Sequence, residues 1–145
     1  MGKNNDIESF IKLIRTGKKI TPYFDRSLED KRITLTQWEV VAKLLERDGI
    51  KQNELVRSIN INKGSLVKLI DLLERDGWVT RTEDKNDKRA KNIKLTSWGR
   101  RNADEVTSIL SEVANKMSAG ISSKELKTIS KALDQMMANT SKANL

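Results

Sequence analysis

The sequence predicts a mainly α-helical fold that carries one small β-hairpin. Apolar residues recur at helical spacing in six segments of the 145-residue chain. Two short β-rich runs follow the fourth of these segments, and a charged loop separates them. The order helix, helix, helix, helix, hairpin, helix, helix is typical of a winged helix-turn-helix with additional helices at both termini (an α+β fold).

The first helix is predicted from an apolar stripe near the N-terminus. Ile7, Phe10, Ile11 and Ile14 follow the i, i+3, i+4, i+7 pattern of one helical face. Pro22 lacks a backbone N–H, so we expect it to kink or interrupt this helix.

The second and third helices form the start of the predicted compact block. Thr34 and Gln37 fit a capping box, which starts a helix. We expect its inner face to consist of Trp38, Val41, Ala42 and Leu45. The third helix is short, spans roughly residues 52–59, and ends in a turn at Asn60–Asn62.

The fourth helix leads directly into the hairpin. Asn62 can cap its N-terminus, and Gly77 is placed for a left-handed C-cap. Its apolar stripe consists of Leu66, Leu69, Ile70 and Leu73. Residues 78–81 and 92–95 are the predicted strands.

The last two helices follow the hairpin. Thr96 is the expected N-cap of the fifth helix, whose apolar residues are spaced by three and four like a heptad seam. Ser122 and Glu125 form a second capping box, which opens the sixth helix.

The outer helices suggest a homodimer. Their apolar faces exceed what the small middle block can cover, and soluble oligomers are most often two-fold dimers. We therefore predict an N-terminal dimerisation helix region at residues 1–32, a winged helix-turn-helix at 33–96 and C-terminal dimerisation helices at 97–145. The predicted interface residues are Ile7, Phe10, Ile11, Ile14, Val113, Met117, Leu126, Ile129 and Leu133.

The composition points to a polyanionic partner and away from catalysis. The formal net charge is +8, which favours nucleic acid, although a merely soluble basic protein has the same balance. The chain has no cysteine and no histidine, so thiol chemistry, disulfides, the usual general base and the usual zinc ligands are absent. We expect no enzyme activity, no metal site and no cofactor.

The chain shows no targeting or membrane segment. Its first residues lack the apolar region of a signal peptide, and no apolar run approaches the ~20 residues that cross a bilayer. We expect a soluble cytoplasmic protein, associated with the nucleoid and not with a membrane.

The fourth helix and the hairpin hold the candidate DNA-binding residues. The helix presents Lys63, Gly64, Ser65 and Lys68 opposite its core stripe, where they can approach phosphates and base edges. A solvated helix face has the same appearance, but the adjoining hairpin favours DNA reading. The hairpin, or wing, adds Arg81, Lys85, Lys88, Arg89 and Lys91.

Arg89 is the leading candidate for insertion into the minor groove, where narrowing strengthens the negative potential. Asp87 stands two residues earlier and can support the wing. A surface ion pair of Asp87 with a neighbouring basic side chain is the alternative.

Four motifs in order resemble the MarR family of transcriptional regulators, and within it the SlyA-like branch. These are Ile33-Thr-Leu-Thr-Gln-Trp38, the helix from Ser65 to Glu74 followed by Gly77, the wing from Asp87 to Thr96 with its Asp-x-Arg motif, and Leu95-Thr-x-x-Gly99. The resemblance implies a homodimer whose recognition helices enter the major groove and whose wings enter the minor groove of a pseudo-palindromic double-stranded DNA operator. It implies Lys63, Gly64, Ser65, Lys68 and Arg89 as contacts.

The resemblance also implies a small aromatic carboxylate effector, bound in a crevice between dimerisation helices and winged helix. Arg15, Lys18, Tyr23 and Trp38 are the candidate lining residues, although core packing for Trp38 and solvation for the two basic residues are the commoner roles. Two features differ from the family pattern: Gly64 stands where close SlyA-like sequences often have proline, and the lack of cysteine excludes a peroxide-sensing thiol.

The preferred function is a dimeric, sequence-specific transcriptional regulator, either a repressor or an anti-silencing activator. A sequence-tolerant architectural DNA-binding protein is the alternative. A third hypothesis is a winged helix that binds proteins and whose basic surface is incidental.

Overall fold

The computed structural model describes residues 2–59 and 61–143, with side chains from residue 6 onward. Residues 1, 60 and 144–145 belong to predicted regions but lie outside the described residues. Asn60 of the turn predicted at residues 60–62 is one of them. The chain divides into two compact units at residues 111 and 112. Each unit is described by itself.

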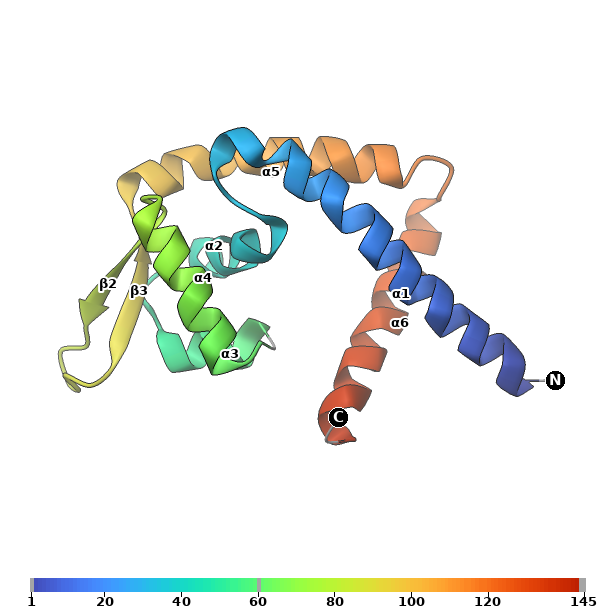
Figure 1. Ribbon diagram of the computed structural model, residues 1–145, viewed down its shortest axis with the longest axis horizontal. Helices are drawn as coiled ribbons and strands as arrows, with labels where there is room; N and C mark the ends of the chain where they lie inside the picture. Colours follow the sequence, from blue (N-terminus) through green and yellow to red (C-terminus); the bar gives the residue numbers. More distant parts are fainter. Residues whose placement is uncertain (1, 60, 144–145) are drawn as a thin grey trace. The chain divides into compact units, whose positions relative to one another are not determined.

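The first unit contains a helical block and a three-stranded sheet (Figure 1). Its helices are α1 (Gly2–Ser27), the 3-10 turn η1 (Glu29–Lys31), α2 (Leu35–Glu46), α3 (Gln52–Ile59), α4 (Lys63–Arg75) and the first part of α5 (Ser97–Met117). Its strands are β1 (Ile50–Lys51), β2 (Val79–Glu83) and β3 (Lys91–Leu95). The sheet is antiparallel in the order β1-β3-β2, with Arg81 opposite Ile93. The predicted fold class is confirmed.

The hydrophobic core lies between α2, α3, α4, the sheet and the start of α5. Buried apolar side chains run along the chain from Leu28 to Val106, and Trp78 is among the largest that are fully buried. Of the predicted stripe of α4, Leu66, Ile70 and Leu73 are buried and Leu69 is partly buried. This packing holds one face of α4 against the core and leaves the opposite face to solvent.

Backbone caps define the predicted helix starts. Thr34 and Gln37 form the capping box of α2, and Asn62 Oδ1 accepts a hydrogen bond from the Ser65 N–H at 2.8 Å. Thr96 caps α5 by accepting from the Gly99 N–H at 2.9 Å. A Cβ at Gly99 would lie 2.4 Å from the Trp78 carbonyl oxygen, so only glycine allows α5 to begin this close to β2.

Three expectations need correction. Of the two effects predicted for Pro22, a kink or an interruption, the interruption is wrong: Pro22 lies inside α1, because losing one backbone donor does not prevent the helix from continuing. The buried face of α2 is Gln37, Val40, Val41 and Leu44. It shares only Val41 with the predicted face, whose Trp38 and Ala42 are partly buried and whose Leu45 is exposed, since α2 has apolar residues on more than one side. Strand β1 was not predicted, because two residues are too short to produce a period-2 pattern.

The second unit contains the end of α5 and helix α6 (Ser123–Lys142). The predicted capping box at its start is present: Glu125 N–H donates to Ser122 Oγ, and Ser122 N–H donates to Glu125 Oε2 at 2.8 Å. That backbone hydrogen bond lowers the pKa of Glu125. No described residue of α6 is buried. Across the described part of the chain, no helix is long and apolar enough to span a membrane.

Candidate nucleic-acid interface

The N-terminal turn of α4 is an exposed, cationic surface. The structure places Lys63, Gly64 and Lys68 in solvent and leaves Ser65 partly exposed. Asn62 uses its side chain to cap Ser65, which fixes the backbone of this turn. A Cβ at Gly64 would meet only Asn62 Oδ1 at 3.5 Å, an ordinary contact, so the fold itself does not require glycine here.

The wing loop between β2 and β3 is organised mainly by Asp84. Its Oδ1 accepts from the N–H groups of Asn86 at 2.8 Å and Asp87 at 3.3 Å, and its Oδ2 accepts from Asn92 Nδ2 at 3.3 Å. The hydrogen bond from the Asn86 N–H is the largest cause that lowers the pKa of Asp84. Sequence reasoning missed this role, although Asp-x-Asn is a typical signal for a side chain that bonds the backbone two residues on.

Asp87 continues the same arrangement at the tip of the wing. Its Oδ1 accepts from the Arg89 N–H at 3.0 Å, and its carbonyl accepts from the Ala90 N–H at 3.0 Å. The Asp87 carboxylate therefore holds the backbone on which Arg89 projects. Within the described residues, Asp87 forms no ion pair, which was the alternative reading.

The cations of the interface fall into two groups. Among the described residues, no ion pair involves Lys63, Lys68, Lys85, Lys88 or Arg89. Lys91 lies 3.5 Å from Glu83, an exposed and weak pair. The unpaired group is therefore distributed over two elements, the N-terminal half of α4 and the wing.

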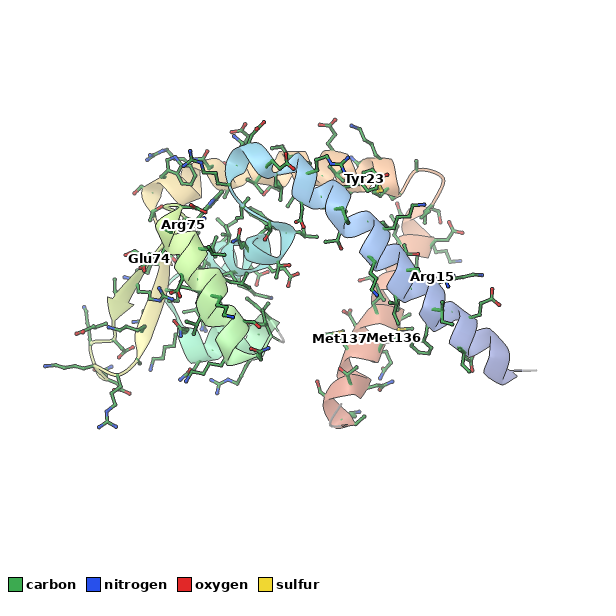
Figure 2. The ribbon with its side chains drawn as sticks, in the orientation of Figure 1. Arg15, Tyr23, Glu74, Arg75, Met136 and Met137 are labelled. Atoms are coloured by element: carbon green, nitrogen blue, oxygen red, sulfur yellow. The ribbon has the colours of Figure 1, made fainter. Side chains whose placement is uncertain are left out.

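Arg81 differs from the rest of this set. Its side chain is only 19% exposed and donates to Asp71 Oδ1 at 2.6 Å and Glu74 Oε1 at 3.0 Å. The Arg81 N–H also donates to Glu74 Oε2 at 3.1 Å, and Gln52 of α3 accepts from Arg81 Nε at 3.4 Å. Figure 2 shows Glu74 at the C-terminal end of α4, beside the wing strands. Arg81 thus joins β2 to α4 and α3.

The candidate effector residues lie on two helices, α1 and α2. Arg15 and Lys18 are exposed on α1, Tyr23 is half-exposed on the same helix, and Trp38 packs partly against the core from α2 (Figure 2 labels Arg15 and Tyr23). The hollow near the junction of α1 and α2 has a volume of about 560 Å³ and includes none of these four. It is lined by Asp25, Glu29, Arg32, Ile33, Thr34, Gln37, Arg75 and Asp76.

The candidate dimerisation residues are largely uncovered in the single chain. In the first unit, Ile7, Phe10, Ile11 and Ile14 are between 44% and 59% exposed on α1. In the second unit Val113 is partly buried. The remaining members are between 37% and 46% exposed: Met117, Leu126, Ile129 and Leu133.

Comparisons with known proteins agree with this geometry. The family model described as MarR family matches residues 33–91, which run from the start of the core to the wing. The crystal structure of a MarR transcriptional regulator from Methanosarcina mazei Go1 matches with a TM-score of 0.78 and 25% identity, over 97% of this chain and 99% of that chain. Family model and solved structure together support the MarR family.

Two further MarR-fold structures were solved with DNA. A mutant MarR from E. coli, complexed with operator DNA, has a TM-score of 0.80 and 24% identity over 91% of this chain and 96% of that one. Reduced AbfR bound to DNA has a TM-score of 0.78 and 21% identity, with 94% of each chain covered. These two likenesses concern the fold, which is the MarR winged helix.

Proposed function

We propose that this chain is a homodimeric, sequence-specific DNA-binding transcriptional regulator of the MarR type. One observation carries the proposal: unpaired cations gather on the two elements that a winged helix inserts into DNA, the start of α4 and the wing tip. Arg89 has the Asp87 carboxylate fixing its backbone, whereas the cations of α4 stand on the face opposite a fully packed stripe. Such positions favour α4 in the major groove and the wing in the adjacent minor groove.

The contacts divide by chemistry. Lys68 stands one turn into α4, within reach of a base edge, while Lys63, Ser65, Lys85 and Lys88 suit phosphates. Arg89 suits a narrow minor groove. We assign Arg81 a positioning role instead of a phosphate contact, because its donors are already used by Asp71, Glu74 and Gln52.

The homodimer belongs to the same proposal. A second copy would cover the exposed apolar faces of α1 and α6 and would set two α4 helices about one DNA turn, ~34 Å, apart. The same proposal places the chain in the SlyA-like branch. It also places the protein in the cytoplasm, associated with the nucleoid, because its proposed partner is DNA. Regulation would act by excluding polymerase or by displacing a silencing protein.

The proposal includes an aromatic carboxylate effector. Arg15 and Lys18 are cationic but exposed, so a binding crevice there needs a further wall from the partner copy. Salicylate titration followed by tryptophan fluorescence tests it, with Arg15→Gln and Lys18→Gln as variants. Saturable quenching that the variants leave unchanged would remove these residues from the site.

Selection of bound duplexes from a random DNA pool tests the main function. We expect an inverted-repeat consensus, because a two-fold dimer reads two half-sites. Lys68→Ala should then cost about 1–3 kcal/mol and relax specificity at one position of each half-site. Near-equal competition by scrambled DNA at physiological salt would favour a sequence-tolerant architectural role instead.

A further inference from the structure

A polar hollow of about 380 Å³ lies between α3, the first residue of α4 and the wing. Its cationic lining consists of Lys51, Arg57, Lys63, Arg89 and Lys91. Lys51 and Arg57 come from β1 and α3, which are separate in sequence from the predicted DNA-binding set. In Figure 1, α3 and the start of α4 lie at the same end of the first unit, toward which the wing tip also extends.

The two carboxylates of the hollow, Glu54 and Asp87, offset only part of its charge and leave a formal excess of three positive charges. Glu54 is paired with Arg47, which is not part of the lining, and Asp87 accepts from the Arg89 backbone. Lys51 and Lys91 have only long ion pairs, at 3.7 Å to Asp84 and 3.5 Å to Glu83. Across the described part of the chain, Arg57, Lys63 and Arg89 have no ion pair. Five cations around one concavity repel each other, so the hollow favours an anion.

The position of the hollow identifies the anion. A helix in the major groove and a wing in the adjacent minor groove stand on either side of one sugar–phosphate backbone. That backbone must pass between the start of α4 and the wing, which is where the hollow lies. Its phosphates carry the charge that lysine and arginine neutralise in protein–DNA complexes.

We propose that this hollow is a phosphodiester-binding site for the backbone that separates the two grooves, with Lys51 and Arg57 as contacts outside the predicted reading residues. The inference depends on the proposed DNA-binding function. Contacts of this kind position the protein without reading sequence. The hollow therefore sets how deeply α4 and the wing enter their grooves.

The first test compares charge removal inside and outside the hollow. The double variant Lys51→Gln, Arg57→Gln is matched by the double variant Lys127→Gln, Lys131→Gln, which removes two exposed lysines of α6. We expect the hollow variant to lose about the same factor on operator and random duplexes, and its log-affinity against log-salt slope to fall by about 2. The control should keep the parent slope. Equal slopes for both variants would overturn the proposal.

The second test locates the phosphate. A neutral methylphosphonate is placed at one backbone position at a time across the selected operator. The parent should lose affinity when the neutral linkage lies in one backbone segment per half-site, between the bases contacted by α4 and those contacted by the wing. At those positions the neutral linkage should cause no further loss of affinity in the Arg57→Gln variant, which already lacks the contact. If the affinity losses caused by Arg57→Gln and by the neutral linkage add at every position, the proposed site is wrong. Thermal unfolding midpoints equal to that of the parent verify that the variants are folded.

A third arm separates DNA phosphate from a free anion. Inorganic phosphate is titrated against chloride at constant ionic strength. We expect no saturable stabilisation of the protein by millimolar phosphate. Saturable stabilisation of the parent that Arg57→Gln abolishes would make the hollow a site for free phosphate and would overturn the proposal. Failure of the parent to bind any duplex in 50 mM salt would instead remove the proposed function itself, since backbone binding is strong under such conditions.

Discussion

The middle of the chain and its terminal helices differ in how far they bury their apolar side chains. The buried apolar residues lie between Leu28 and Val106, whereas α6 has no buried residue within its described range. Phe10 on α1 and Ile129 on α6 are close to half exposed. Such exposed apolar faces on long helices are typical of interaction surfaces. The middle region therefore completes its own core, and the terminal helices keep apolar faces exposed that the proposed second copy would cover.

The same contrast holds for charge. Arg81 has two carboxylates and an amide oxygen around a mostly buried guanidinium, whereas Arg89 is exposed and, among the described residues, without an ion pair. Both arginines belong to the wing, and the sequence alone predicted the same DNA-binding role for both. The paired Arg81 serves the fold, whereas the exposed Arg89 is available to the proposed DNA partner.

The largest expected effect is in the core. Ile70→Ala removes a fully buried side chain of α4 and should lower the free energy of unfolding by about 2–5 kcal/mol. Leu72→Ala on the same helix is the control, because Leu72 is 37% exposed and should cost far less. Urea unfolding at one fixed protein concentration measures both. Similar losses would show that burial in the middle region does not decide its stability.

The next effect concerns the terminal helices. Ile129→Asp would place a carboxylate in the proposed dimer interface and should weaken dimerisation by about 3 kcal/mol, roughly 100-fold. Thr128→Asp adds the same charge one residue away, on the exposed side of α6 that faces away from its apolar stripe, and should have little effect. Sedimentation equilibrium compares the two. A dimer that tolerates Ile129→Asp as well as Thr128→Asp would exclude this face of α6 from the interface.

A smaller effect separates the two arginines. Arg89→Gln should reduce the salt slope of DNA binding by about 1, because a phosphate or groove contact is lost. Arg81→Gln should leave the slope unchanged and lower the free energy of unfolding by about 1–2 kcal/mol, since Asp71 and Glu74 lose their shared partner. Salt-dependent binding and urea unfolding of both variants measure this. A reduced slope for Arg81→Gln would return Arg81 to the DNA contacts.

The smallest effect is the pH response of the wing loop. Because backbone hydrogen bonds lower the folded-state pKa of Asp84, its contribution is fully present above the ordinary aspartate pKa and is lost as pH falls through the lowered value. We expect protection of the Asn86 amide from exchange at neutral pH and its loss only in strong acid. Asp84→Asn should remove this pH dependence. A loop that keeps the same acid transition in Asp84→Asn would assign it to another group.

Much of the fold followed from local chemistry. Capping boxes at Thr34 and Ser122, the Asn62 cap and the apolar stripe of α4 depend on residues within one or two helical turns of each other. Such short-range patterns can be read from a sequence alone. The buried face of α2 could not, because two helical faces of similar apolar character compete, and only the surrounding elements select between them.

The sequence predicted which basic residues belong to the candidate interface, but it did not predict the role of each one. Lys63, Lys68 and Arg89 stood out because they occupy a polar helix face and a charged hairpin. Lys51 and Arg57 carried no local signal, since they join the hollow only when β1 and α3 pack beside the wing. Their grouping with wing residues, up to the 40 positions that separate Lys51 from Lys91, is a property of the packed chain.

By itself, the sequence determined the helices, their caps, the hairpin and the excess of positive charge, because these depend on neighbours along the chain. Only the tertiary structure decided which cations are neutralised and which remain available, because that depends on contacts between elements far apart in sequence. Arg81 meets Asp71, Glu74 and Gln52 only after α3, α4 and β2 have packed. Arg89 is left in solvent by the same packing.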